Sequence, residues 1–272
     1  MRKLHWCGMV SLALLCAGAR AADPLVVYSE RKEPLIQPIF EAYTAETGIE
    51  VRWLTDAAPV LIERLVAEGE HTQADLFMAV DAGSLWQAAE RGVLQSISSE
   101  TLDAAIPSNL RDPDGRWYAL SQRARTIVRS TERVAPEQLS TYEALADPEW
   151  KGRLCLRSSK KVYNQSLTAT LIARSGAEQT ESVVQGWVHN LAAPPFADDS
   201  LLAQAIAAGQ CDVGVINTYY LARLQKDEPD FPVTVFWPNQ RGAGVHVNIS
   251  GAGVVKHSDD VAGATRLLEW LA

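Results

Sequence analysis

Residues 74–92 read Ala-Asp-Leu-Phe-Met-Ala-Val-Asp-Ala-Gly-Ser-Leu-Trp-Gln-Ala-Ala-Glu-Arg-Gly. The apolar run at 74–80 is typical of a central strand that is buried on both faces of a parallel sheet. A helix is predicted over 82–91, and Gly92 ends it. A buried strand followed directly by a helix of this length indicates a βαβ unit, so we expect an α/β fold with a mostly parallel sheet.

The same alternation of strand and helix continues on both sides of this stretch. Before it, the patterns predict strands at 25–28 and 49–54 and helices at 34–47 and 60–68. After residues 117–120 the pattern changes to an extended stretch at 125–129 and the start of a helix at 142–145. A second α/β set then follows, with strands at 153–157, 212–216 and 245–249 and helices at 164–174, 180–192, 200–208 and 262–271. A chain of this length with two such sets suits two domains better than one.

The N-terminus has the pattern of a secretory signal peptide. Arg2 and Lys3 precede an apolar core at 9–18, and Ala19-Arg20-Ala21 is an Ala-x-Ala cleavage signature. We therefore predict a signal peptide at 1–21, cleaved on export. No later segment of the sequence is apolar enough to cross a bilayer, so no stable membrane insertion is expected.

The charge balance excludes some classes of partner. Loss of Arg2, Lys3 and Arg20 from 25 basic residues leaves 22 against 33 acidic residues, a net charge of about −11. An acidic chain without a basic run is a poor match for nucleic acid or an anionic membrane surface. Cation binding stays compatible with this charge.

Two cysteines, Cys155 and Cys211, remain after residue 21. In an oxidising compartment an isolated pair favours a structural disulfide, with two buried free thiols as the alternative. A bridge would hold the strands at 153–157 and 212–216 beside each other.

Two adjacent tyrosines, Tyr219 and Tyr220, lie between an apolar strand and the helix-like Leu-Ala-Arg-Leu at 221–224. Phenols at such a junction can both point into a cleft, where their hard oxygens suit a cation such as Fe(III). The alternative is that one tyrosine packs in the core and the other lies on the surface.

No enzyme motif stands out, so we expect no catalytic activity. Gly242-Ala-Gly244 and Gly251-Ala-Gly253 lack the third glycine of a dinucleotide loop. The histidines His71, His189, His246 and His257 are dispersed, which disfavours a zinc site. A secreted hydrolase is the alternative from another class of protein. The absence of a recognisable nucleophile and base motif in the sequence disfavours it.

Several stretches spread in order over nearly all of the exported part carry a family resemblance. They lie at 27–33, 74–83, 106–117, 139–148, 157–165, 217–220 and 238–253, with Asn-Thr-Tyr-Tyr at 217–220 among them. In these stretches the chain resembles the periplasmic ferric-iron-binding proteins, the solute receptors of bacterial iron ABC transporters. The resemblance implies a type II periplasmic binding protein fold, with two α/β lobes joined by crossover strands and a ligand cleft between them. We expect an N-terminal lobe at 22–124, joined by 250–272, and a C-terminal lobe at 125–249.

The resemblance also implies the metal ligands. The family's three tyrosines correspond to Tyr163, Tyr219 and Tyr220, and the helix start at Tyr163 favours a phenolate. Many relatives add a His or a His-Tyr after the first strand, where this chain has Arg31-Lys32-Glu33. Glu33 is thus a candidate carboxylate ligand, with a solvated Glu at a helix start as the alternative. Water or a small anion such as carbonate could fill the other iron positions.

Arginines can hold such an anion through bidentate hydrogen bonds. Arg123 and Arg223 match positions that approach the iron in similar proteins, and Arg31 and Arg125 are further candidates. For each of them, a surface or interlobe salt bridge is the alternative.

The function implied is that of a monomeric periplasmic receptor that closes on Fe(III), free or chelated, and delivers it to an inner-membrane ABC permease. The nearest rival has the same fold with an oxyanion or polyamine as ligand. The sequence ends in the apolar helix-like segment 264–272, before the point where the family normally ends. We therefore expect a truncated product, and a non-functional homologue is a further alternative.

Overall fold

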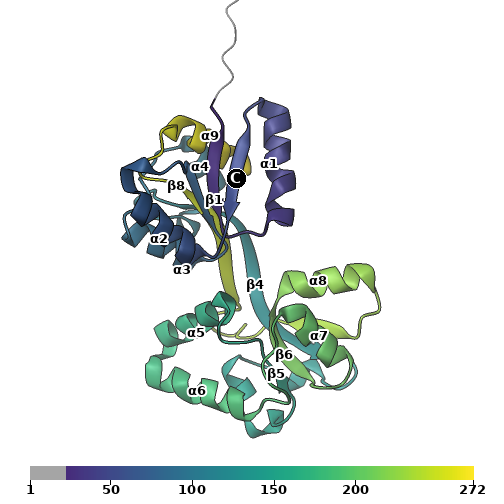
Figure 1. Ribbon diagram of the computed structural model, residues 1–272. Helices are drawn as coiled ribbons and strands as arrows, with labels where there is room; N and C mark the ends of the chain where they lie inside the picture. The colour runs from purple at the N-terminus through teal and green to yellow at the C-terminus, as the bar shows by residue number, and fades with distance from the viewer. Residues whose placement is uncertain (1–22) are drawn as a thin grey trace, which may run out of the picture.

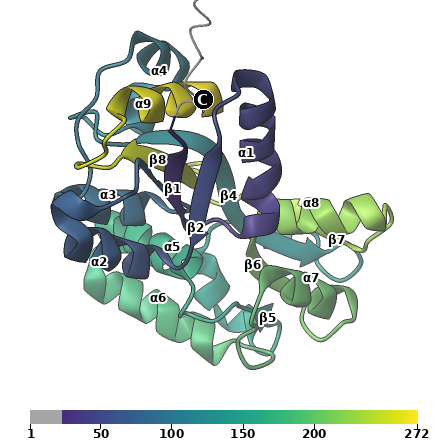
Figure 2. The same cartoon turned by 45° about the horizontal axis from the view of Figure 1, so that its top comes forward.

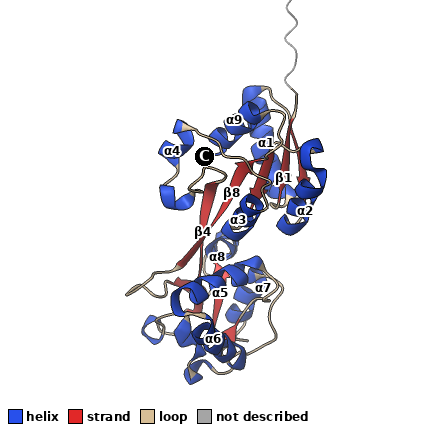
Figure 3. Cartoon of the chain, turned by 90° about the vertical axis from the view of Figure 1, so that its left-hand side faces the viewer, coloured by secondary structure: helices blue, strands red, loops and turns tan. Residues whose placement is uncertain are grey.

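An eight-stranded sheet runs through the molecule in the order β2-β1-β3-β8-β4-β6-β5, with β7 paired to β4. The computed structural model describes residues 23–272; the predicted signal peptide at 1–21 lies outside the described residues. Helices cover the strands on both sides in two separate groups (Figures 1 and 3). The chain therefore has the two-lobed α/β architecture expected from its sequence.

The first lobe is built around three parallel strands, β1 (Leu25–Ser29), β2 (Val51–Thr55) and β3 (Leu76–Ala79). Its helices are α1 (Glu33–Thr47), α2 (Ala58–Glu68), α3 (Ala82–Glu90), α4 (Glu100–Ala105) and α9 (Val261–Leu271). All four residues of β3 are buried, as its apolar sequence predicts. Helix α9 returns from the far end of the chain to this lobe (Figure 2), and Trp270 packs edge-on against Tyr43 of α1 with ring centroids 5.3 Å apart.

The second lobe contains three short strands and four helices. The strands are β5 (Leu154–Cys155), β6 (Val213–Asn217) and β7 (Val233–Phe236). The helices are α5 (Val162–Ser175), α6 (Ala177–His189), α7 (Asp199–Ala207) and α8 (Thr218–Asp227). Its hydrophobic core is divided into one cluster around Trp150, Leu171 and Trp187 and another around Cys155, Ile206 and Leu221.

Two long antiparallel strands, β4 (Tyr118–Ser130) and β8 (His246–Val254), connect the lobes (Figure 1). Tyr118 belongs to the core of the first lobe, whereas Ile127 belongs to the core of the second. Glycines let the two strands approach: a Cβ on Gly251 would lie 2.3 Å from the carbonyl oxygen of Tyr118. We call this pair of strands the β4/β8 ribbon.

The sequence patterns missed some elements of the fold. β4 begins at Tyr118, before the predicted extended stretch at 125–129, and β8 extends five residues beyond the predicted end at residue 249. β7 and α4 were not predicted. The helix expected from residue 142 is a 3₁₀ turn at Glu143–Ala146; the other 3₁₀ turns are Gly69–His71, Ser108–Leu110, Pro136–Gln138 and Pro148–Trp150. Within residues 23–272, no helix combines the length and apolar character needed to cross a membrane.

Candidate functional site

Three tyrosines meet at the N-terminal ends of two helices of the second lobe. The fully buried strand β6 leads directly into α8, and Tyr219 and Tyr220 occupy the first turn of that helix, with ring centroids 4.4 Å apart. Tyr163 is the second residue of α5. The Tyr219 hydroxyl donates to the Tyr163 hydroxyl at 3.3 Å, so residues 56 positions apart present their phenol oxygens together.

The surroundings keep the paired phenols protonated at neutral pH. Burial raises the pKa of Tyr219, and its hydrogen bond to Tyr163 raises it further. Burial also raises the pKa of Tyr220, against the lowering effect of the nearby Arg157 guanidinium. A bound cation would reverse this balance, because opposite charge next to a phenol favours phenolate.

Guanidinium groups surround the phenol rings. Arg123 lies over Tyr163 at 5.1 Å from the ring centroid, and Arg223 lies over Tyr219 at 5.2 Å. Burial lowers the pKa of Arg123, although the charges of Tyr163 and Asp81 oppose that effect. The Arg123 Nη2 atom is buried, and the described part of the chain (residues 23–272) offers it no hydrogen-bond acceptor. The two arginines singled out for approach to the site therefore both lie against its tyrosines.

Arg157 is a third arginine at the site that the sequence reasoning missed. Its guanidinium lies 5.5 Å from the Tyr163 ring centroid and 5.8 Å from that of Tyr220, and Nη1 donates to the Tyr220 hydroxyl at 3.5 Å. Burial would lower the pKa of Arg157, but Tyr220 and the buried Asp199 together raise it. The sequence does offer one indication of this role, because Arg157 is the first residue of the stretch 157–165, which contains Tyr163.

Arg125 lies beneath the phenols, with its side chain only 2% exposed. Its Nε donates to Asn164 at 2.9 Å, and Nη1 donates to Asp199 at 3.0 Å and to Asn217 at 3.1 Å. Asn164 follows Tyr163 in the chain, and Asn217 lies two residues before Tyr219. Arg125 thus joins the two helix starts through a buried ion pair within the second lobe, which is neither the surface nor the interlobe salt bridge considered as its alternative.

Arg31 and Glu33, the two candidates that follow β1, lie apart from this contact network. Arg31 donates through Nη2 to Ser250 on β8 at 2.9 Å. Glu33 is exposed at the first residue of α1, and no hydrogen bond or ion pair within residues 23–272 connects it to a tyrosine. Glu30 is a carboxylate that the sequence reasoning passed over: it accepts from the Val80 amide at 2.9 Å, and burial raises its pKa.

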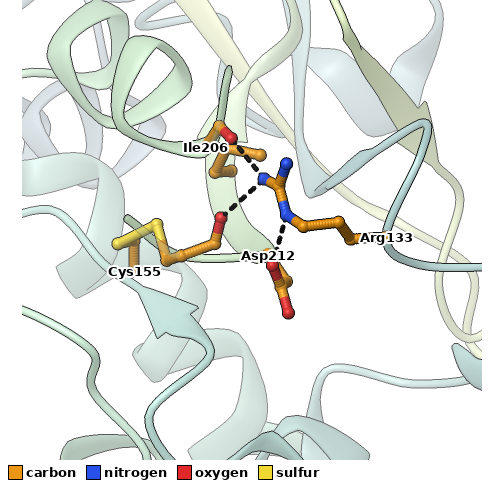
Figure 4. The surroundings of a disulfide bond; sticks show 5 residues. Arg133, Cys155, Ile206 and Asp212 are labelled. Atoms are coloured by element: carbon orange, nitrogen blue, oxygen red, sulfur yellow. Dashed lines mark hydrogen bonds and ion pairs between the residues drawn. A yellow bond between two sulfur atoms is a disulfide. The ribbon is translucent and has the colours of Figure 1, made fainter. Parts of the chain in front are cut away.

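A disulfide between Cys155 and Cys211 supports the strand that leads to Tyr219 and Tyr220 (Figure 4). It joins β5 to Cys211, two residues before β6, with a Cα–Cα distance of 6.0 Å. Arg133 donates beside it to the Cys211 carbonyl at 3.2 Å and to the Asp212 carboxylate at 2.7 Å. Both ends of β6 are therefore tied down, by the disulfide at one end and by Arg125 at the other.

The donor chemistry of the site suits a hard cation. The site becomes anionic when the three phenols lose their protons. The nearby guanidinium groups then balance part of that negative charge. Within residues 23–272, His, Cys, Asp and Glu side chains form no group of three or more that could hold a metal.

Comparison with known proteins places the chain in a family. A family model described as bacterial extracellular solute-binding protein matches residues 71–267. The chain belongs to this family. This solute-binding protein is 42% identical, over 98% of its length and 76% of the relative, to iron uptake protein A1 of Synechocystis sp..

Solved structures agree with that membership. A Trichodesmium FutA in complex with iron and citrate ligands is 45% identical to the solute-binding protein, with a TM-score of 0.83 over 91% of this chain and 80% of that one. Apo FutA2 from Synechocystis is 42% identical, with a TM-score of 0.82 over 92% and 80% of the two chains.

Proposed function

We propose that this chain is a periplasmic receptor that binds ferric iron between its lobes and delivers it to an inner-membrane ABC permease. The observation that carries the proposal is the meeting of the Tyr163, Tyr219 and Tyr220 phenols at two helix N-termini. The names of the relatives, an iron uptake protein and a protein in complex with iron and citrate, support the same cargo.

In this proposal the three phenolates bind Fe(III), and each loses its proton to solvent as the metal arrives. The positive end of each helix dipole stabilises the negative charge that forms there. Arg157 and Arg223 balance that charge over the rings, because each is within cation–π distance of a tyrosine.

The remaining iron positions would be taken by water or by a small anion such as carbonate. Such an anion would accept a hydrogen bond from the buried Nη2 of Arg123, which finds no hydrogen-bond acceptor among residues 23–272. The roles of Arg31 at the anion and of Glu33 as a ligand stay predictions. Both residues are on the first lobe, and a closing movement would bring side chains of that lobe toward the metal. We assign 22–124 with 250–272 to that lobe and 125–249 to the lobe that carries the tyrosines.

The test is the colour of the loaded protein. Purified chain mixed with ferric citrate is expected to develop a visible phenolate-to-iron charge-transfer band. Tyr163→Phe, Tyr219→Phe and Tyr220→Phe should each weaken and shift it, because each removes one phenol oxygen. Tyr43→Phe, a buried tyrosine of α1 in the other lobe, is the matched control and should leave the band unchanged.

A correctly folded protein that shows no band would refute the iron assignment. Calorimetric titration of that same protein with phosphate and with spermidine would then decide between the oxyanion and polyamine alternatives.

A further inference from the structure

Asp81 makes a contact between the lobes directly beside Tyr163. It follows β3 in the first lobe and caps α3, where Oδ1 accepts from the Gly83 amide at 2.8 Å. Its other oxygen, Oδ2, accepts from the Ser166 hydroxyl at 2.5 Å and from the Asn248 side-chain amide at 2.6 Å. The side chain is only 2% exposed, so these contacts replace its hydration.

The partners of Asp81 come from different parts of the fold. Ser166 is on α5, whose Leu167 and Leu171 belong to the core of the second lobe. Asn248 is on β8, in the β4/β8 ribbon. The carboxylate of Asp81 thus connects the first lobe, the ribbon and α5.

The geometry of α5 transmits this contact to the metal site. Ser166 and Tyr163 are three residues apart in one helix, so their side chains lie on the same face, one turn apart. A helix turn held at Ser166 therefore also fixes where Tyr163 places its phenol relative to Tyr219.

Arg123 makes a second connection between Asp81 and Tyr163. Arg123 and Asn248 are cross-strand partners in the ribbon, so both side chains lie on one face of it. The Arg123 guanidinium is 3.9 Å from the Asp81 carboxylate and 5.1 Å from the Tyr163 ring centroid. The negative charge of Asp81 thereby holds in place the cation that covers this tyrosine.

We propose that Asp81 is a positioning residue for Tyr163, which it holds against the first lobe through Ser166 and Arg123. This inference rests on the proposed function, because it makes the third phenolate dependent on contact between the lobes. Loss of that contact frees the first turn of α5 and with it Tyr163. Only Tyr219 and Tyr220 then hold the iron firmly, so iron release becomes faster.

The experiment removes one hydroxyl on the opposite side of the contact. Ser166→Ala leaves Asp81, Arg123 and all three tyrosines in the chain. Losing a hydrogen bond to a charged group should speed iron release to a competing chelator roughly 10-fold or more. The charge-transfer band should shift as well, which a purely structural role would not cause. Ser166→Thr keeps a hydroxyl and should restore both properties.

Ser182→Ala is the matched control, since Ser182 is exposed on α6 and, among residues 23–272, its hydroxyl bonds only the Glu178 carbonyl of its own helix. Release rate and band should equal those of the unchanged chain. An unchanged release rate and band in Ser166→Ala would overturn the proposal.

A metal-free measurement separates this proposal from the iron assignment. In the iron-free protein, Ser166→Ala should raise amide hydrogen exchange in the first turn of α5, and Ser182→Ala should not. If the unchanged chain shows no charge-transfer band, the iron assignment fails, and the exchange result still decides whether Asp81 holds α5. Unchanged exchange in Ser166→Ala would refute the contact itself.

Discussion

Each tyrosine that would bind the metal must first lose a proton, and the protein environment makes that loss harder for Tyr219 and Tyr220. Burial raises the pKa of both phenols, so iron-free protein holds their protons at neutral pH. The apparent affinity for Fe(III) is therefore set by how well the metal competes with protons for the phenol oxygens, as at other metal sites with protonated ligands.

We predict that affinity rises with pH and falls as the solution becomes acidic. For each proton that is released on binding, the apparent binding constant for Fe(III) should rise about tenfold per pH unit. The reason is that the proton concentration appears once in the binding equilibrium for each such proton. Competition with a chelator of known pH dependence, measured between about pH 6 and about pH 8, gives the slope. Tyr219→Phe should reduce this slope by one proton, and an affinity independent of pH would contradict the phenolate site.

The site residues differ in how well the sequence could identify them. Tyr163, Tyr219 and Tyr220 follow from the family resemblance, because each is in a stretch with a recognisable local pattern. Arg157 and Asp81 also lie in such stretches, but their partners Tyr220 and Ser166 are distant in the chain. These contacts depend on how elements far apart in the chain pack together, which local patterns do not encode.

At the scale of elements, the shortest strand of the sheet is also the one joined covalently. β5 has two residues, and it pairs with β6 only through Leu154 with Val213 and Cys155 with Gly214. The disulfide to Cys211 supplements this small backbone contact, and it encloses a sequence separation of 56 residues.

Replacing both cysteines by alanine should lower the free energy of unfolding by roughly 2–4 kcal/mol, since the open chain gains loop entropy when unfolded. Urea denaturation of the double variant measures the loss. Unchanged chain treated with a reductant should show the same shift in midpoint, and an unshifted midpoint in both samples would contradict a stabilising bridge.

The strength of an element's pattern decided whether it was predicted. The strands β1, β3 and β6 have apolar sequences and were predicted within two residues of their observed ends. Only residues 125–129 of β4 were predicted, because Ser121 and Gln122 before them are exposed and polar where the ribbon lies between the lobes. In β8, the sequence Ser-Gly-Ala-Gly at 250–253 lacks the β-branched residues typical of strands. Close packing requires both glycines, Gly251 against Tyr118 of β4 and Gly253 against Arg116 just before β4.

On the scale of the whole molecule, the three phenols belong to one lobe and Asp81 belongs to the other. The lobes are joined by the β4/β8 ribbon, and a two-stranded ribbon bends more easily than a wide sheet. The lobe with the tyrosines can thus take up iron first, and the other lobe, already in contact with α5 at Asp81, then rotates further over it.

We predict that Fe(III) makes the protein more compact. Small-angle X-ray scattering should show a smaller radius of gyration for the loaded chain than for the iron-free chain. Tyr219→Phe, which weakens the site, should reduce this change, and Tyr43→Phe should not. Identical scattering curves with and without iron, in a protein that shows the charge-transfer band, would exclude closure.

The disulfide between Cys155 and Cys211 also has a consequence for the biogenesis of the protein. Thiols stay reduced in a bacterial cytosol and pair in the periplasm. In the proposed periplasmic receptor, the bridge that supports β6 would therefore form only after export. The two tyrosines would then gain their full support in the same compartment in which the receptor collects its cargo.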